Sequence, residues 1–167
     1  MLKKIKIVPH SGANEIHFGM DRESVRSILG TPFNSEEASV FEFDDIKIDN
    51  PAKDNYFENE LQICYDTNLQ VEYIECYGNE AEYLEVFLDD TNIFRTSVPE
   101  LLEIVKSGYQ ADYDDTNEEL PYSYIFRQLD LSFWRQEIAN DEGNEFFWSI
   151  GIGKKGYYEL EKSDSTI

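Results

Sequence analysis

The stretch Phe18-Gly19-Met20-Asp21-Arg22-Glu23-Ser24-Val25-Arg26-Ser27-Ile28-Leu29-Gly30-Thr31-Pro32 contains the strongest local structural signal of the chain. Asp21 is a favourable N-cap, and Met20 and Val25 stand at the two positions of a hydrophobic staple. Gly30 followed by Pro32 is a typical helix stop. The stretch therefore predicts a helix of about two turns, which needs to pack on a sheet to be stable.

A second unit of the same kind begins 76 residues later, in Phe94-Arg95-Thr96-Ser97-Val98-Pro99-Glu100-Leu101-Leu102-Glu103-Ile104-Val105. Ser97 and Glu100 have the spacing of a capping box. In this alignment Phe18 matches Phe94, and Ile28 matches Ile104. We expect the two units to superpose, with these matched side chains inside the core.

Alternating apolar and polar residues predict about three antiparallel strands after each helix. The predicted strands are residues 2–8, 40–43, 61–65, 69–77, 83–88, 122–127, 129–135 and 146–152. Turn residues stand at 66–68 and 140–144. The stretches 31–39, 49–60 and 109–120 have the composition of linkers.

These patterns together predict an α+β fold made of two tandem repeats, each a short helix followed by antiparallel strands. The first repeat covers residues 1–80 and the second covers residues 81–167. A chain of 167 residues is close to the usual size of a single core. We therefore expect the repeats to pack as one compact unit.

The chain is strongly acidic, with 14 Lys and Arg against 35 Asp and Glu and a net charge of −21. Hydrophobic residues make up 41%, including 11 Phe and 11 Tyr, which favours a folded protein over an acidic disordered one. Such a surface indicates a positively charged partner, although solubility alone is an alternative explanation. The same charge disfavours direct binding to nucleic acid.

The sequence offers few residues for catalysis. His10 and His17 are the two histidines, and neither stands in a known catalytic motif. Cys64 and Cys76 lack Cys-x-x-Cys spacing and are expected to be reduced thiols. We predict no enzyme activity, no catalytic residues and no cofactor. With no apolar run long enough for a membrane span or a signal peptide, we expect a cytoplasmic protein without membrane contact.

Residues 112–117 begin like the calcium-binding loop of an EF-hand. Position 6 of that loop is Asn117, where the sharp turn needs glycine. Position 12 is Ser123, where a bidentate glutamate is needed. We therefore predict no metal site.

Two long stretches, Asp54–Phe94 and Ser107–Phe126, contain no Lys or Arg. Tyrosines beside carboxylates supply flat contact area together with acceptors for arginine, as expected of a surface that binds a basic patch. A merely solvated loop is the alternative. The predicted partner-binding residues are Asp112, Tyr113, Asp114, Asp115, Glu118 and Glu119 in the second stretch, and Glu72, Glu75, Glu82 and Glu85 along an acidic sheet edge in the first.

Residues 16–32 resemble the Gly-hydrophobic-x-x-x-x-Val-x-x-x-Leu-Gly-x-Pro motif of proteins with the β-lactamase-inhibitor-protein-like fold, which include small outer-membrane assembly lipoproteins. The runs Leu61 to Tyr65 and Val71 to Glu75 are similar to strands of small acidic immunity proteins that act against polymorphic toxins. The chain lacks the signal peptide and lipidation cysteine of the lipoproteins, so the resemblance implies the immunity role. It implies a fold and a binding mode, and no catalytic residues.

From the charge and the resemblance together, we predict a cytoplasmic immunity protein that blocks a cognate basic toxin, with a nuclease domain as the expected target. The alternative is a DNA mimic or regulatory adaptor that binds a host DNA-binding protein.

Overall fold

In the computed structural model, which describes residues 2–78, 81–136 and 145–159, the opening strand β1 (Lys3–Val8) lies at the centre of a small sheet. Its neighbours are β10 (Leu84–Leu88), which is parallel to it, and the short β2 (Gly12–Ala13). The sheet order is β11-β10-β1-β2-β3, with β3 at Ile16–His17 and β11 at Thr91–Asn92. Ile5 and Ile7 point into the core while the intervening lysines face outward, as expected of a half-buried strand.

Helix α1 (Arg22–Leu29) begins and ends as the sequence predicts. The Asp21 side chain caps it by accepting a hydrogen bond of 2.9 Å from the Ser24 N–H. Gly30 ends it with a φ of 86°, which a residue with a Cβ rarely adopts. Helix α2 (Val98–Tyr109) follows the short η1 (Ile93–Arg95).

The expectation that Ile28 and Ile104 lie inside the core was wrong. Ile28 is 44% exposed and Ile104 is 36% exposed. Residues of a helix follow one another by about 100°, so each of these side chains is about 60° away from the buried Val25 or Leu101 and lies at the margin of the apolar face. The two helices thus expose matched positions, while the superposition of two whole repeats stays a prediction.

The large sheet is antiparallel throughout and has the strand order β12-β13-β14-β9-β8-β7-β4. Its strands are β4 (Asn34–Glu36), β7 (Ala52–Tyr56), β8 (Leu61–Tyr65), β9 (Val71–Tyr77), β12 (Ser123–Phe126), β13 (Leu131–Trp134) and β14 (Ser149–Gly153), with η2 (Arg127–Leu129) between β12 and β13. Strands from residues 1–80 meet strands from residues 81–167 at the β9–β14 pair. Both sheets therefore combine the two predicted repeats.

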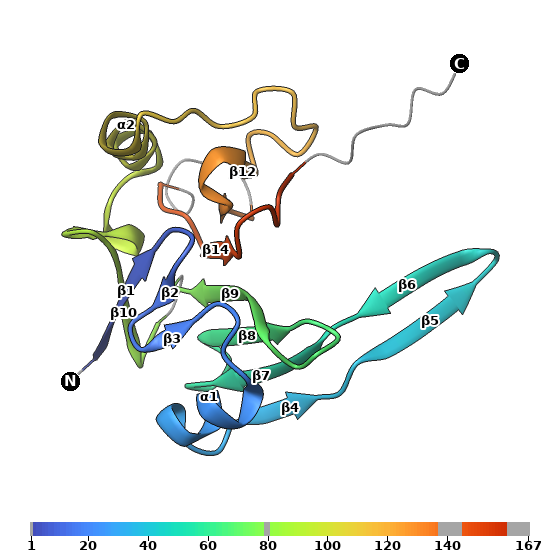
Figure 1. Ribbon diagram of the computed structural model, residues 1–167. Helices are drawn as coiled ribbons and strands as arrows, with labels where there is room; N and C mark the ends of the chain where they lie inside the picture. The colour runs from blue at the N-terminus through green and yellow to red at the C-terminus, as the bar shows by residue number, and fades with distance from the viewer. Residues whose placement is uncertain (1, 79–80, 137–144, 160–167) are drawn as a thin grey trace.

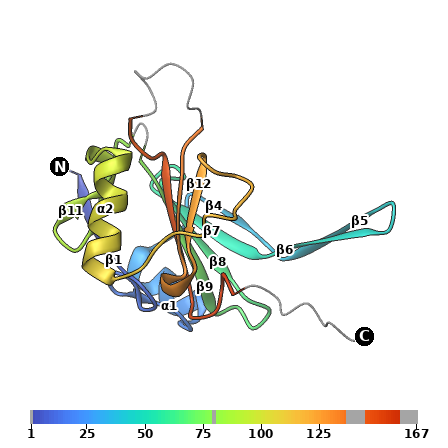
Figure 2. The same cartoon turned by 90° about the horizontal axis from the view of Figure 1, so that it is seen from above.

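The core lies between one face of the large sheet and the elements that cover it. Ile63, Ile74 and Phe133 are fully buried on this face. Figure 2 shows α2 and β1 together on one side of the large sheet. The opposite face of the large sheet carries polar side chains together with aromatic ones such as Tyr73, and we call it the outer face.

Strands β5 (Ser39–Phe43) and β6 (Ile46–Asn50) form a separate two-stranded sheet that extends away from the body (Figure 1). We call residues 39–50 the arm. The arm and β7 occupy much of the stretch 49–60 that resembled a linker, so that prediction was wrong. The other predicted strands outside the arm are present with ends shifted by up to three residues. The predicted turn at 140–144 lies outside the described residues.

Candidate protein-binding groove

The outer face of the large sheet carries polar side chains in cross-strand register. Asn55 on β7 lies opposite Gln62 on β8, which in turn lies opposite Glu75 on β9. The Gln62 side-chain amide donates a hydrogen bond of 3.0 Å to the Asn55 side-chain oxygen. Burial raises the pKa of Glu75, which hydrogen-bonds with Tyr77 and Ser149. This face is therefore polar and ordered by side-chain contacts.

Two adjoining hollows lie over this face and together form what we call the outer-face groove. The first, of about 350 Å³, is lined by Glu58, Asn59, Glu60, Tyr77, Ala81, Glu82, Tyr83, Trp134 and Trp148. The second, of about 430 Å³, shares Asn59 and Tyr77 with the first and extends toward β4. The rings of Trp134 and Trp148 meet edge to face, with their centroids 6.1 Å apart. The groove thus combines large aromatic surfaces with carboxylates.

Two carboxylates of the groove, those of Glu58 and Glu60, are held in place by hydrogen bonds. Glu60 accepts bonds from three successive backbone N–H groups, including 2.6 Å from Glu82 and 2.9 Å from Leu84. The Tyr83 hydroxyl donates a bond of 2.8 Å to Glu58, and this bond raises the pKa of the tyrosine. No Lys or Arg occurs among the described residues that line the groove. Its electrostatic potential therefore favours a cationic group.

Trp148 lines the groove, but its ring nitrogen Nε1 is buried and has no hydrogen-bond partner among the described residues. Because this atom is covered, it does not offer a hydrogen bond to a molecule in the groove. The lining therefore offers aromatic surface and carboxylates, which fit a positively charged side chain.

None of residues 112–119 of the acidic loop lines the groove, and these residues differ in their contacts. Asp115, Glu118 and Glu119 are exposed, and Asp112 lies 3.4 Å from Lys106. Asp114 instead accepts a bond of 2.7 Å from the Arg127 guanidinium. The sixth predicted residue, Tyr113, packs edge to face against Tyr124, with centroids 4.9 Å apart. Three of the six predicted residues, Asp112, Tyr113 and Asp114, therefore make structural contacts.

The predicted acidic sheet edge does not exist. Glu72 and Glu75 belong to β9, which lies between β14 and β8, whereas Glu85 belongs to β10 in the other sheet, between β11 and β1. Glu72 lies 3.5 Å from Lys154, and Glu85 lies 3.9 Å from Arg95. The prediction failed because sequence alternation identifies strands but not their neighbours. Of these four glutamates, Glu82 lines the outer-face groove.

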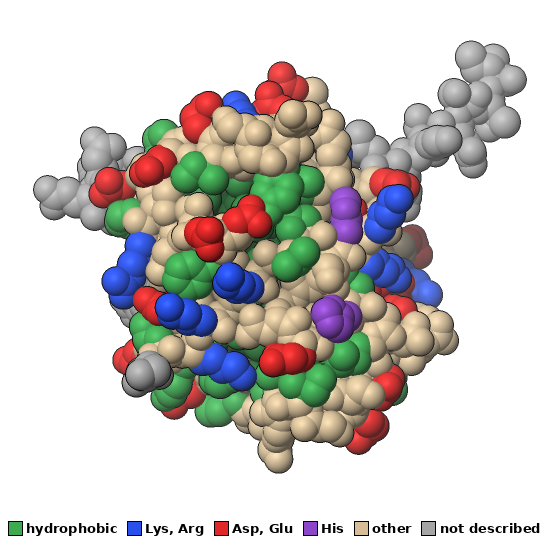
Figure 3. Space-filling model, turned by 60° about the vertical axis from the view of Figure 1, so that its left-hand side comes forward, with side chains coloured by type: hydrophobic (Ala, Val, Ile, Leu, Met, Phe, Trp, Pro, Cys, Tyr) green, Lys and Arg blue, Asp and Glu red, His purple; other side chains and the backbone are tan. Residues whose placement is uncertain are grey.

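The acidity is not spread evenly over the molecule. Figure 3 shows the side that carries β1 and β10, where histidine, lysine and arginine side chains lie among acidic and hydrophobic ones. Lys3, Lys4 and Lys6 are exposed along β1. His10 lies 3.0 Å from Asp130, a contact that does not involve the groove. This side therefore carries charges of both signs.

No family model, curated protein or solved structure matches this chain. The resemblance of residues 16–32 to the β-lactamase-inhibitor-protein-like fold therefore stays a prediction. Within the described residues, no helix has the length and apolar character needed to cross a membrane. No group of metal-ligating side chains is found in the same part of the chain.

Sequence reasoning missed Glu58, Glu60, Trp134 and Trp148 as groove residues. A signal for the glutamates was present, because both lie in the Asp54–Phe94 stretch that contains no Lys or Arg. The tryptophans come from the second half of the chain and reach the groove through the β9–β14 pairing. Nothing in the local sequence around them indicates that contact.

Asp114 and Asp115 give a first testable prediction, because they are adjacent but differ in their contacts. Bonds from Thr116 and Arg127 lower the pKa of Asp114 to about 2, so its ionised form is stabilised by folding. We expect Asp114→Lys to lower the thermal unfolding midpoint clearly at pH 7. Asp115→Lys, which makes the same charge change on an exposed side chain, is expected to leave it nearly unchanged. Differential scanning calorimetry would measure both, and equal midpoints would contradict the assigned Asp114–Arg127 pair.

Proposed function

We propose that this protein is an acidic immunity protein that binds and neutralises a basic toxin domain, such as a nuclease, in the cytoplasm. The observation that carries the proposal is the outer-face groove, whose described lining combines four glutamates and two tryptophans without Lys or Arg. The proposal requires no enzyme activity, cofactor or metal of the protein itself.

The groove supports this proposal through the chemistry of cation recognition. An arginine or lysine side chain placed over a tryptophan ring gains about 0.5 to 2 kcal/mol from the cation–π interaction, depending on desolvation. Carboxylates beside the ring, such as Glu58 and Glu82, add charge-assisted hydrogen bonds to the same group. A basic side chain from the toxin thus finds both kinds of contact in one hollow.

The net charge of −21 adds long-range attraction to these local contacts. A basic partner is attracted from a distance and oriented before contact, which raises the association rate. The exposed Asp115, Glu118 and Glu119 contribute to this field even where they do not touch the partner. Once bound, the toxin would be neutralised by occlusion of its substrate-binding surface.

The proposal is tested with a catalytically inactivated toxin domain encoded by the adjacent gene. Stopped-flow measurements should give an association rate that falls steeply as ionic strength rises, because charges separated by more than about 8 Å are screened at physiological salt. Absence of binding would overturn the immunity proposal. Binding instead to a host DNA-binding protein, in competition with DNA, would establish the DNA-mimic alternative.

A matched pair of variants locates the contact surface. Glu82→Lys and Glu118→Lys change the net charge equally, but Glu82 lines the groove and Glu118 belongs to the acidic loop. We expect Glu82→Lys to slow association and to speed dissociation, and Glu118→Lys to change the association rate alone. A faster dissociation caused by Glu118→Lys would assign direct contact to the acidic loop instead.

A further inference from the structure

The arm is an antiparallel hairpin of residues 39–50 closed by a two-residue turn. Asp44 and Asp45 in the turn both have positive φ angles, 46° and 65°, as a type I′ turn requires. Five cross-strand pairs, from Ser39–Asn50 to Phe43–Ile46, define its register. Figures 1 and 2 both show the arm projecting beyond the rest of the molecule.

The two faces of the arm differ in character. Phe41 lies opposite Ile48, and Phe43 lies opposite Ile46, so these four side chains share one face. Their exposures are 57%, 48%, 63% and 61%, respectively. The other face carries Val40 and three charged side chains, Glu42, Lys47 and Asp49. The arm is therefore an amphipathic ribbon whose apolar face is open to water.

An exposed apolar hairpin is unfavourable in free energy unless another surface covers it. An isolated two-stranded hairpin is marginal in water, and contiguous exposed apolar patches usually mark interaction sites. Both long edges of the arm also leave backbone groups without a neighbouring strand among the described residues. Binding to a partner would cover the apolar face and give the strand edges a neighbour.

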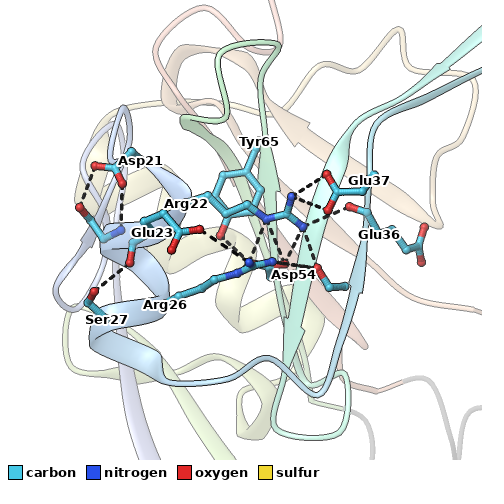
Figure 4. A network of polar contacts seen from close by, with 11 residues as sticks. Asp21, Arg22, Glu23, Arg26, Ser27, Glu36, Glu37, Asp54 and Tyr65 are labelled. Carbon is cyan, nitrogen blue, oxygen red and sulfur yellow. Dashed lines mark hydrogen bonds and ion pairs between the residues drawn. The ribbon is translucent and has the colours of Figure 1, made fainter.

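A buried ionic network holds the root of the arm, as Figure 4 shows. Asp54, just after the arm, is fully buried and lies 2.8 Å from the Arg22 guanidinium and 2.9 Å from that of Arg26. Ser35, just before the arm, donates a bond of 2.7 Å to Asp54. Glu37 lies 2.9 Å from Arg22. Both strands that lead into the arm are thus fixed to helix α1, so the arm is preorganised and not a loose loop.

The charges of the arm identify the kind of partner. Asp44 and Asp45 lie at the tip of the arm and Glu42 and Asp49 on its other face, and together they outnumber the single Lys47. A second copy of this chain would bring another net charge of −21 against these carboxylates and would be repelled. A basic protein with an apolar cleft is complementary to both features of the arm.

We propose that the arm inserts its apolar face into an apolar cleft of the basic toxin, with Asp44 and Asp45 at its tip meeting Lys or Arg side chains at the rim. This inference rests on the proposed function and names the element that makes the apolar contact. The outer-face groove receives a basic side chain of the same partner, while the arm supplies the buried area that a long-lived complex needs.

The test compares a double variant on the apolar face of the arm with a single variant on its other face. The double variant Phe43→Thr with Ile46→Thr removes one apolar pair but keeps residues that favour strands. Val40→Thr makes the same kind of change on the opposite face, where the side chain is similarly exposed. Affinity for the inactivated toxin domain is measured by isothermal titration calorimetry, and thermal midpoints are recorded for every variant.

We expect the double variant to bind about tenfold more weakly or worse and to lose protection in a toxin-challenge assay, with an unchanged thermal midpoint. Val40→Thr should stay within about twofold of the wild type. If the double variant binds the toxin domain as tightly as the wild type does, the arm inference is overturned and the proposed function is not. A wild-type protein that binds no toxin would overturn the proposed function, and the inference with it. If sedimentation equilibrium shows that the wild type is a dimer and the double variant a monomer, the arm binds a second copy of this chain and the inference is overturned.

Discussion

Replacing Asp54 by Ala is expected to lower the free energy of unfolding by about 3 to 5 kcal/mol, because it leaves two arginines without their buried counter-ion. Arg22 is itself buried, and both its Nε and Nη2 groups donate to Asp54. Arg26 contacts the same carboxylate through its own Nε at 3.0 Å. The Tyr65 hydroxyl also donates to it, at 3.1 Å. Urea-induced unfolding would measure the loss.

Glu37→Gln is the control for this prediction. Glu37 also pairs with Arg22, but its side chain is 78% exposed. Exposed pairs contribute about 0 to 1 kcal/mol, so the Glu37 variant should unfold nearly as the wild type does. An Asp54→Ala variant with wild-type stability would show that the network does not hold α1 to β7.

The pH dependence of stability gives a second readout for Asp54. The arginine contacts outweigh burial and hold the pKa of Asp54 well below its usual range. Its contribution to stability is therefore complete above the unfolded pKa of about 3.9 and is lost as the pH falls toward the lower folded value. The wild type should lose stability over this acid range, and Asp54→Asn should show a shallower slope there.

Local signals in the sequence were sufficient for the helices and for most strands. Asp21 and Gly30 fix the two ends of α1 through hydrogen bonds to Ser24 and Arg26, three and four positions away, so their effect needs no knowledge of the rest of the fold. Alternation located Leu61–Tyr65 because its apolar residues lie on one face of a strand. These features depend on neighbours in the sequence.

Strand β7 could not be predicted in this way. Its sequence, Ala-Lys-Asp-Asn-Tyr, contains polar residues that are typical of a linker, yet Asp54 and Asn55 are buried. The burial of Asp54 is compensated by Arg22 and Arg26, which stand 32 and 28 positions earlier. A pattern within a short window carries no information about such partners.

The arm and the groove also depend on contacts that a local sequence pattern does not reveal. Val40–Phe43 was predicted as a strand, and it is one, but alternation does not tell whether an apolar face is covered. The excess of acidic residues in Asp54–Phe94 indicated a cation-binding surface. Only the strand order shows that Trp134 and Trp148 lie beside those carboxylates.

Leu101 and Ile104 of helix α2 are three positions apart but differ in burial, and this difference gives the last prediction. Leu101 is fully buried among core side chains, so Leu101→Ala is expected to lower the free energy of unfolding by about 2 to 5 kcal/mol. Ile104 is the matched control, because it has the same number of carbon atoms but lies at the margin of the apolar face.

Ile104→Ala should cost about 1 kcal/mol, less than Leu101→Ala, since Ile104 is 36% exposed and alanine favours the helix more than isoleucine does. Chemical denaturation of both variants would measure the difference. An equal or larger loss at Ile104 would place that side chain in the core and would contradict the orientation of α2. The expected asymmetry follows from the helical angle of about 60° between Leu101 and Ile104, which places Leu101 in the core and Ile104 at the partly exposed margin of the apolar face.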